Sequence, residues 1–473
     1  MTALLGGLLI ICLHLLGALS GLMALMSSRT SQGAIAWIIC LITFPYLAIP
    51  AYWFLGRPRF YGYVSAREQR DTSLRRVLDQ FRTLVEPAFA HPEDARLRAV
   101  ERLAMLPMTG DNHCQLLING HDTFESLFQG IDQAEDYVLI QFFIVRNDAL
   151  GQALKRRLIE CAERGVHVFF LYDEIGSHAL PERYFEELRA AGIAVHPFGS
   201  SKGWRHRFQV NFRNHRKIMV ADGHHGWVGG LNVGVEYRGE SKKHGHWRDT
   251  HLKLTGPAVL GLQESFWEDW HWATGDILSL AWHPHAAPGK ARQHVVIVPS
   301  GPSDPLETAS LLIQHAINQA NERFWVTSPY FVPDQGVQDS LKLAALRGVD
   351  VRVMMPERPD HLLVFLSAFS FLGEMIRAGV KIYRYQPGFL HQKTFLIDDH
   401  TSAVGTVNLD NRSFRLNFEV TAYVSDQAFA AEVAQMLEAD FASCRQVMLE
   451  EIEKRPLWHK LAARAAYLAS PIQ

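Results

Sequence analysis

The stretch NHRKIMVADGHHGWVGGLN at residues 214–232 decides the fold, because a related stretch, LHQKTFLIDDHTSAVGTVN, returns at residues 390–408. In each stretch a histidine is followed by a lysine two residues on, an aspartate seven residues on and an asparagine seventeen residues on. One such pattern alone would indicate only a polar surface segment. Two copies with the same offsets predict two domains of the same fold.

The sequence around the two stretches repeats as well. Residues 133–173 and 319–356 each contain an apolar strand pattern, a helix pattern, an RGV turn and a second apolar strand pattern. Strands that alternate with amphipathic helices are typical of α/β domains with a sheet buried on both faces. We therefore predict an α/β protein with two similar sandwich domains at 106–285 and 286–455, joined through the Pro-, Gly- and His-containing stretch 282–293.

Two apolar runs without a charged residue, 3–26 and 34–55, occupy the N-terminal part of the chain. At about 1.5 Å per residue, each run is long enough to cross roughly 30 Å of hydrocarbon. The short loop between them predicts a transmembrane hairpin over residues 1–56. A cleaved signal peptide is the alternative, but the first residues carry no basic group and the apolar core is too long.

The arginines beside these runs predict the orientation of the hairpin. Four of them, Arg57, Arg59, Arg67 and Arg70, follow the second run, whereas Arg29 alone lies in the loop. By the positive-inside rule, this asymmetry predicts a multi-pass protein of the cytoplasmic (inner) membrane with its large C-terminal part in the cytoplasm.

Two further segments have a helical, amphipathic pattern. Residues 57–105 are predicted to form a connector that leaves the membrane, and residues 456–473 a tail that lies on the membrane surface or docks on the protein.

The apolar segment 360–376 is too short to span a bilayer. It is either a buried core helix or a wall of a channel for acyl chains.

Composition excludes some classes of function. A formal net charge of −2 and a pI near 6.9 give no overall basic field, so no nucleic-acid partner is predicted. Five cysteines without a CxxC pair are typical of a reducing compartment.

A zinc site is the alternative suggested by a group of histidines, but no cysteine or carboxylate completes a known ligand spacing, so neither metal nor cofactor is predicted. These histidines are His224, His225, His244, His246 and His251.

The paired motif residues have the chemistry of a phosphoryl-transfer site. A histidine and a lysine two apart on a strand point to the same face, which places a reactive imidazole beside a compact positive charge. Two facing copies would supply a nucleophile on one side of phosphorus, an acid on the other, and cations and amides for the remaining oxygens without a metal ion. The predicted residues are His215, Lys217, Asn232, His391, Lys393 and Asn408.

Four carboxylates accompany the motifs. Asp249 and Glu419 each lie at the start of a later strand, where a carboxylate orients a histidine and fixes its tautomer. The spacing from histidine to carboxylate is longer in the first copy. Asp249 lies 34 residues after His215, whereas Glu419 lies 28 residues after His391. Asp222 and Asp398 lie at the ends of their strands and do not share the face of the histidine and the lysine, so we predict a structural role for both.

The two HxK(x)₄D motifs, followed by GGLN and GTVN, resemble those of the phospholipase D superfamily. Four further segments narrow the resemblance to membrane-anchored bacterial cardiolipin synthases: SQGAIAW at 31–37, SPYFVPD at 328–334, GTVNLDNRSFRLNFEV at 405–420 and KRPLW at 454–458. This resemblance implies two phospholipase D-type sandwich domains with a shared active site. It also implies phosphatidylglycerol, cardiolipin and the lipid bilayer as partners.

The reaction that the resemblance implies is transfer of a phosphatidyl group between two phosphatidylglycerol molecules, giving cardiolipin and glycerol through a phosphatidyl-histidine. In that scheme His215 is the nucleophile and His391 the acid and base. The motif lysines and asparagines hold the phosphate oxygens, and Asp249 and Glu419 orient the histidines. Aspartate in the first copy departs from the glutamate of the family pattern.

Other functions use the same residues. A phospholipase D hydrolase or a phosphatidylserine synthase differs only in the acceptor, which is water or serine. A nuclease is suggested by the basic and aromatic stretch RHRFQVNFRNHRK at 205–217, against which stand the membrane hairpin and the neutral net charge. A membrane scaffold with inert domains is the alternative outside enzymes, and the completeness of both motifs disfavours it.

Overall fold

The computed structural model describes residues 2–28, 30–56, 86, 89–90, 94–199, 211–241, 245–289 and 292–473. Several sequence-based predictions fall on residues outside this set. They concern Arg29, Arg57, Arg59, Arg67, Arg70, His244, most of the connector 57–105 and parts of the stretches 205–217 and 282–293.

The globular part consists of two successive sets of elements. A helix α6 (Ala95–Ala104) precedes them. The first set contains β1 (Thr109–Ile118), α7 (Asn119–Gln133), β2 (Tyr137–Phe142), α8 (Ala149–Glu163), β3 (His167–Asp173), α9 (Glu182–Ala190), β4 (Ala194–Phe198), β5 (Arg213–Asn214), β6 (Ile218–Ala221), β7 (His225–Gly229), a 3-10 helix η3 (Val235–Arg238), β8 (His246–Arg248), β9 (Thr250–Thr255) and α10 (Val259–Thr274).

The second set repeats this order with β12 inserted after β11 and further elements at its end. It contains β10 (Gln293–Ser300), α11 (Thr308–Gln319), β11 (Arg323–Thr327), β12 (Phe331–Val332), α12 (Gln335–Leu346), β13 (Asp350–Pro356), α13 (Leu362–Arg377), β14 (Lys381–Tyr385), β15 (Gly388–Leu390), β16 (Thr394–Ile397), β17 (Thr401–Gly405), β18 (Leu409–Asp410), α14 (Asn411–Arg415), β19 (Asn417–Ser425), α15 (Gln427–Ala442), β20 (Cys444–Gln446), α16 (Leu449–Glu453), α17 (Leu457–Tyr467) and η4 (Ser470–Ile472).

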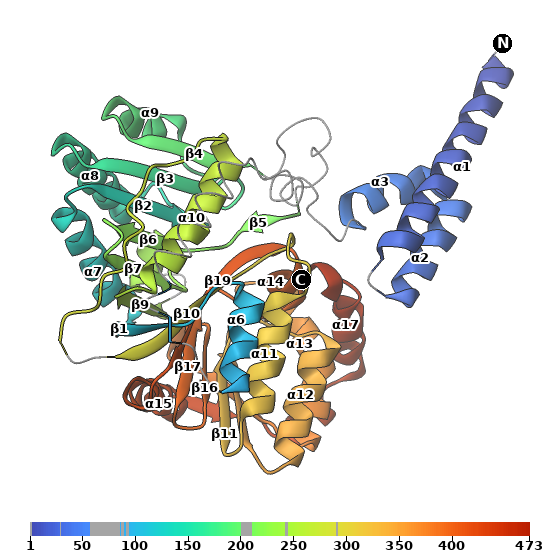
Figure 1. The fold of residues 1–473 in the computed structure, drawn as a ribbon. Helices are drawn as coiled ribbons and strands as arrows, with labels where there is room; N and C mark the ends of the chain where they lie inside the picture. Colours follow the sequence, from blue (N-terminus) through green and yellow to red (C-terminus); the bar gives the residue numbers. More distant parts are fainter. Residues whose placement is uncertain are drawn as a thin grey trace.

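One sheet runs through both halves (Figure 1). Its order in the first half is β4-β3-β2-β6-β7-β9-β1, and in the second half β14-β13-β11-β16-β17-β19-β10, so the halves have the same topology. They join where β1 and β10 pair antiparallel. This arrangement confirms the predicted α/β class and the internal repeat.

Helices cover both faces of this sheet, which explains the uninterrupted apolar strands. Every residue of β2 is buried, as expected when a strand has helices on both sides. One core cluster lies between the first-half sheet and α7, α8 and α9. A larger cluster includes residues of α10, α11 and α13 and continues from one half into the other. The halves therefore pack as one body around a shared core.

Each half also contributes a short strand to the other half. β5 pairs in parallel with β19, and β15 pairs in parallel with β8. These pairings continue into the motifs, since the His215 amide donates to the Phe418 carbonyl at 2.9 Å and the His391 amide donates to the Arg248 carbonyl at 2.8 Å. Each motif histidine is thus fixed to the backbone of the opposite half.

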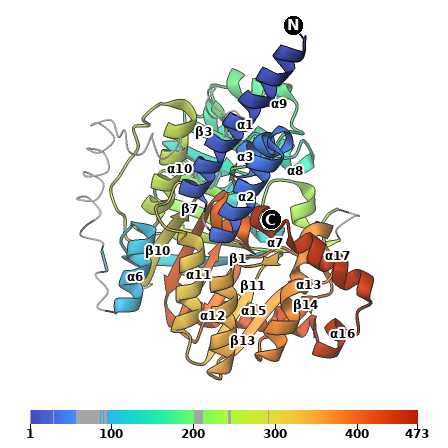
Figure 2. The same ribbon diagram turned by 90° about the vertical axis from the view of Figure 1, so that its right-hand side faces the viewer.

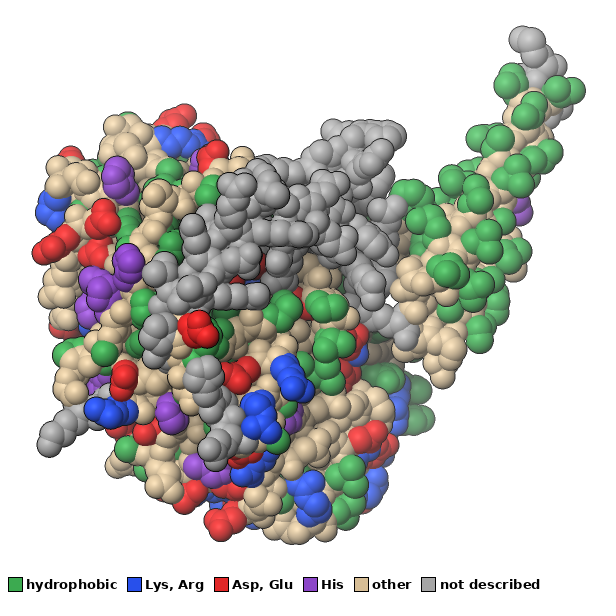
Figure 3. Space-filling model, in the orientation of Figure 1, with side chains coloured by type: hydrophobic (Ala, Val, Ile, Leu, Met, Phe, Trp, Pro, Cys, Tyr) green, Lys and Arg blue, Asp and Glu red, His purple; other side chains and the backbone are tan. Residues whose placement is uncertain are grey.

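Three apolar helices, α1 (Thr2–Ser27), α2 (Ser31–Thr43) and α3 (Pro45–Leu55), stand beside the globular part. Hydrophobic side chains cover their visible surface in Figure 3. Within the described ranges, one helix, over Leu4–Ser27, is long and apolar enough to cross a membrane. The structure therefore contains one candidate membrane span, with α2 packed beside it.

The second apolar run differs from the single span that we predicted. It forms two helices that break at Phe44, because Pro45 disfavours a helical conformation at the residue before it. The 13 residues of α2 reach only roughly 20 Å at the helical rise. Alone, α2 is too short to cross a bilayer.

The segment 360–376 forms most of α13, and only one face of this helix is buried. Ser367, Phe371 and Met375 lie in the core, whereas Leu362 and Leu363 are exposed. Of the two alternatives predicted for this segment, a buried core helix therefore fits its inner face but not its first turn. α17 packs against α13, and both lie on the side of the globular part that carries the N-terminal helices (Figures 1 and 2).

Candidate active site

Sheet topology places both His/Lys pairs at one edge. β6 is antiparallel to β2, so its first residue lies beside Gln141, near the carboxyl end of β2. In the same way, Thr394 at the start of β16 pairs with Thr327 at the end of β11. Lys217 and Lys393 immediately precede these strands. Because ligands of α/β sheets bind at the carboxyl ends of parallel strands, this edge is where a site is expected.

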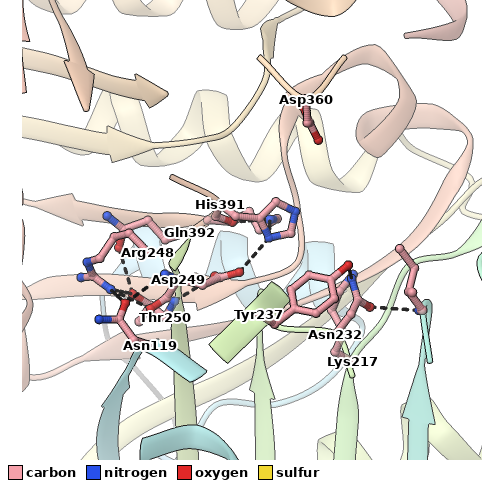
Figure 4. Close-up of polar contacts among 12 residues, drawn as sticks. Asn119, Lys217, Asn232, Tyr237, Arg248, Asp249, Thr250, Asp360, His391 and Gln392 are labelled. Carbon is pink, nitrogen blue, oxygen red and sulfur yellow. Dashed lines mark hydrogen bonds and ion pairs between the residues drawn. The ribbon is translucent and has the colours of Figure 1, made fainter. Parts of the chain in front are cut away.

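Each motif histidine pairs with a carboxylate from the other half. His215 Nδ1 lies 2.8 Å from Glu419 Oε2, and His391 Nδ1 lies 2.7 Å from Asp249 Oδ2. Figure 4 shows the second of these pairs. An ionised carboxylate only accepts hydrogen bonds, so Nδ1–H of each imidazole donates and Nε2 keeps its lone pair. Both Nε2 atoms are therefore available for chemistry.

Burial sets the charge of these pairs. It lowers the pKa of His215 and of His391 to about 4, since an imidazolium loses its hydration inside the protein. Burial alone would raise the pKa of Glu419, but the charges and hydrogen bonds around it hold that pKa below its usual value. At neutral pH the geometry therefore favours neutral imidazoles on ionised carboxylates.

The two lysines are buried beside the histidines. Lys217 Nζ donates to the His215 carbonyl at 2.6 Å, and Lys393 Nζ donates to the His391 carbonyl. Burial lowers the pKa of Lys393 to about 8 and that of Lys217 well below its ordinary value. An anion that enters the site would restore the charged form of both ammonium groups.

The motif asparagines lie at the same edge in different environments. Asn232 Oδ1 accepts from the Ile144 amide at 3.1 Å, and its Nδ2 donates to the Tyr237 hydroxyl at 3.3 Å. Asn408 is buried, and its Oδ1 has no hydrogen-bond partner among the described residues. Asn232 is thus held in one orientation by the protein, whereas the Asn408 carbonyl oxygen is left to accept a hydrogen bond from a ligand.

A glycine before Asn232 makes room for the carboxylate rather than for a ligand. A Cβ atom at Gly230 would lie 2.0 Å from Asp249 Oδ1. Only a residue without a side chain fits there, because a contact that short is sterically excluded.

Asp222 and Asp398 lie away from the imidazoles and cap backbone amides. Asp222 Oδ1 accepts from the amides of Asp136 and Tyr137 at 2.8 and 2.9 Å. Asp398 Oδ1 accepts from the amides of Glu322 and Arg323 at 2.9 and 3.0 Å. Both aspartates have positive φ, 55° and 51°, at the tight turn that follows their strand. Each carboxylate therefore fixes the turn to the start of a neighbouring strand.

Two buried ion pairs lie next to the motif residues. Arg216, between the motif residues of the first half, pairs with Asp269 of α10 at 2.8 Å. In the second half the matching position is Gln392, and Arg248 of the first half instead pairs with Asp440 of α15 at 2.7 Å. The second pair joins the two halves directly beside the Asp249 carboxylate.

Several aromatic and acidic residues of the site were not predicted from the sequence. The rings of Trp247 and Tyr237 lie 5.2 and 6.3 Å from the His391 ring, and the Phe143 ring lies 5.1 Å from the His215 ring. Tyr330 donates to Asp360 at 2.6 Å on the far side of the same site. Tyr330 belongs to the SPYFVPD segment, so the sequence contained a signal for this residue. It contained no signal for the other residues named here.

The histidines of the alternative zinc site are spread over different surroundings. His224 lies against His285, His225 contacts Thr255, and burial lowers the pKa of His251 to about 3. Among the residues that the structure describes, no group of three or more His, Cys, Asp or Glu side chains is arranged to hold a metal ion.

Comparison with known proteins places this site in a family. The family model described as "Cardiolipin synthase, PLD-like domain" matches residues 127–242 and 313–443. Cardiolipin synthase A of Pseudomonas aeruginosa (strain LESB58) is 50% identical over 472 residues, covering 98% of this chain and 96% of the relative. Cardiolipin synthase A of Pseudomonas putida (strain F1) is 47% identical over 471 residues, covering 98% of both chains.

A solved structure shares the fold. The crystal structure of phosphatidylserine synthase from Haemophilus influenzae Rd KW20 matches with a TM-score of 0.59 and 15% identity, covering 80% of this chain and all of that one. At that identity the likeness supports the fold alone. The near full-length identity to the Pseudomonas proteins and the two matched domains show that the chain belongs to the cardiolipin synthase family of the phospholipase D superfamily.

Proposed function

We propose that the protein transfers a phosphatidyl group from one phosphatidylglycerol to another, releasing glycerol and forming cardiolipin. The proposal rests on the family and on one observation above all, the crossed pairing of His215 with Glu419 and of His391 with Asp249. Crossing the pairs brings two prepared imidazoles and two lysines into a single buried site. Such a site suits a reaction in which a nucleophile and a separate acid–base group act on one phosphorus atom.

In the first step, Nε2 of His215 attacks the phosphorus of phosphatidylglycerol. A P–N bond forms and the P–O bond to the headgroup glycerol breaks, while His391 in its protonated form gives its proton to the departing oxygen. The phosphodiester that binds between the lysines favours this protonation, since a nearby anion raises the pKa of an imidazole. The product of this step is a phosphatidyl-histidine and free glycerol.

In the second step, a hydroxyl of the second phosphatidylglycerol attacks the same phosphorus. His391, now neutral, takes the hydroxyl proton, a new P–O bond forms and the P–N bond to His215 breaks. The proton count is restored, and the enzyme needs no nucleotide. Lys217, Lys393 and the Asn408 amide would bind the phosphoryl oxygens throughout.

The substrate class also fits the apolar N-terminal helices, which associate the protein with the membrane. We propose that α1 crosses the inner membrane once and that the bent pair α2 and α3 crosses it back. The catalytic halves then face the cytoplasm, in line with the arginines after residue 56. A tethered site meets its lipid substrates at high effective concentration.

Purified full-length protein in phosphatidylglycerol vesicles tests the reaction. With a chelator present, cardiolipin and free glycerol should appear in equal amounts. Phosphatidic acid in place of cardiolipin would mean that water is the acceptor and would contradict the proposal. Loss of all turnover on chelation would contradict the metal-independent mechanism.

A further inference from the structure

A small hollow opens to solvent beside the active site, in the second half of the protein. It lies between the loop after β11, the loop after β13 and the start of α13. Its lining includes Tyr330, Asp360, Val364, Phe365 and Arg384. We refer to it as the acceptor pocket.

The pocket lies at the sheet edge that carries the second motif. Tyr330 follows β11, Asp360 follows β13, and Arg384 is the residue before the end of β14, so all three lie at the carboxyl ends of neighbouring parallel strands. The Asp360 charge acts on Lys393, where it opposes the effect of burial on the pKa. Figure 4 shows the Asp360 carboxylate facing the space beside His391. Pocket and catalytic site are therefore adjacent.

Arg384 gives the pocket its chemical character. The side chain is only 3% exposed, and its Nη1 donates to the Pro356 carbonyl at 2.9 Å. Its Nη2 is buried and has no hydrogen-bond partner among the described residues. Burial lowers its pKa to about 10, which still leaves the guanidinium charged at neutral pH. A buried donor without a partner is costly, so this group is poised to receive an anion.

Nearby carboxylates do not satisfy this charge. Glu357 is held by Arg445 through two hydrogen bonds of 2.9 and 3.1 Å. Glu451 is bonded to the same arginine at 2.7 Å. The Arg384 guanidinium instead lies over the rings of Phe365 and Phe369, at 4.9 and 5.3 Å. These rings hold the guanidinium in place without neutralising it.

The first half has no counterpart of this residue. β4 and β14 each follow a glycine with positive φ, at Gly192 and Gly379. Arg384 lies five residues after its glycine, and the residue at the same distance in the first half is Pro197. The internal repeat therefore breaks at this position, which indicates a function needed on one side of the site only.

We propose that the acceptor pocket binds the headgroup of the second phospholipid, with Arg384 on its phosphodiester and the Tyr330–Asp360 pair on its glycerol hydroxyls. This inference rests on the proposed function and names the residues that select the acceptor. In cardiolipin formation the attacking hydroxyl belongs to a glycerol that already carries a phosphodiester. Water and serine carry no phosphodiester. A cation that binds the phosphodiester of the acceptor, one glycerol away from the attacking hydroxyl, therefore favours phosphatidylglycerol over water and serine.

The surroundings agree with this assignment in two respects. The exposed Leu362 and Leu363 continue α13 from the pocket lining, so the acyl chains of a bound lipid would meet an apolar surface. The pocket adjoins the second motif, since the charge of its Asp360 acts on Lys393. The acceptor would then arrive on the side of the acid–base group, opposite the nucleophile, as an in-line second step requires.

The test uses full-length protein in uncharged detergent micelles with phosphatidylglycerol as donor and two soluble acceptors at equal concentration. One acceptor is labelled glycerol, and the other is glycerophosphoglycerol, which has the same hydroxyls and adds the phosphodiester. Arg384→Met should lower the ratio of transfer to glycerophosphoglycerol over transfer to glycerol by about tenfold or more, the size expected for a lost charged hydrogen bond. Arg384→Lys should lower this ratio less.

Arg352→Met is the matched control, since Arg352 also lies over two aromatic rings, of Trp325 and Phe441, but outside the pocket. It should leave the ratio unchanged. An Arg384→Met protein that lowers transfer to both acceptors in proportion, or to neither, would overturn the proposal. Competition by inorganic phosphate as strong as by glycerophosphoglycerol would identify a free-phosphate site and would also overturn it.

A second variant covers the case in which Arg384 variants fail to fold. Asp360→Asn changes an accessible side chain and should reduce the preference for glycerol over 1-propanol as acceptor. An unchanged preference would exclude the role given to the Tyr330–Asp360 pair. Failure of the proposed function is distinguishable, because the unaltered protein would then transfer to no alcohol and form only phosphatidic acid.

Discussion

The imidazole of His215 and the carboxylate of Glu419 lie 2.8 Å apart although 204 residues separate them in the chain. The pair His391 and Asp249 mirrors this relationship at 2.7 Å. Neither half therefore contains a histidine together with the carboxylate that orients it, and the active unit is the packed pair of halves.

Replacing the crossed carboxylates should slow the reaction without preventing lipid binding. Glu419→Gln and Asp249→Asn should each lower kcat by about 10²–10⁴-fold, because the wrong tautomer of the histidine becomes available. Glycerol release from phosphatidylglycerol micelles measures kcat. Glu453→Gln is the control, since Glu453 pairs with Arg377 at the exposed surface. A Glu419→Gln protein with normal kcat would refute the orienting role.

The two histidines should respond differently to the leaving group. A phosphatidyl ester of p-nitrophenol needs no protonation on departure, so His391→Ala should still release a burst of nitrophenolate, whereas His215→Ala should release none. Stopped-flow absorbance measures the burst, and phosphatidylglycerol serves as the substrate that needs the acid. The opposite result would exchange the two roles.

Activity should depend on pH through the buried lysine and the histidines. The free imidazoles, with pKa values of about 4, are already neutral at pH 5, so His391 must take up its proton when the phosphodiester binds. Since a protonated His391 becomes rarer as pH rises, kcat/KM should already fall between pH 5 and 8. Lys393 is charged below its pKa of about 8 and loses its charge above it, so the fall should become steeper above pH 8. Assays in uncharged micelles between pH 5 and 10 check this. A fall of kcat/KM below pH 6.5 would contradict the histidine environment.

The ion pair between Arg248 and Asp440 should matter for stability. Both side chains are largely buried, and removal of one partner leaves the other charge without compensation, which costs about 3–5 kcal/mol. Arg248→Met should therefore lower Tm strongly, and the double variant with Asp440→Leu should recover part of the loss. The exposed pair Arg377–Glu453 is the control, for which no measurable change is expected.

Cysteine labelling in intact cells should report the orientation of the N-terminal helices. In a background without native cysteines, Ser28→Cys lies between α1 and α2, and Asp111→Cys lies in the exposed part of β1. An impermeant maleimide should label the first in intact cells and the second only after lysis. Labelling of both from outside would place the catalytic halves on the other side of the membrane.

The sequence predicted the repeat, the α/β class and the candidate residues because each follows from local spacing. It did not predict the crossing of the carboxylates. The interval from a motif histidine to Asp249 or Glu419 is compatible with pairing inside one half or across both, and only the pairing of β5 with β19 and of β15 with β8 decides.

Other differences trace to particular residues. The break of the second apolar run at Phe44 was foreseeable from Pro45, a signal that hydropathy alone does not register. The role proposed for Arg384 was not foreseeable from the sequence. It depends on the burial of its Nη2 atom and on the packing of its guanidinium against aromatic rings of α13.

The exchange of strands between the halves has a consequence for synthesis on the ribosome. β5 leaves the ribosome about 200 residues before its partner β19, which at roughly 5–20 residues per second is a delay of about 10–40 s. During that interval the first motif has neither its carboxylate nor its neighbouring strand, while α1, α2 and α3 have already been made. The nascent chain therefore reaches its lipid surroundings well before it can act on them, and catalysis begins only when the last third of the protein arrives.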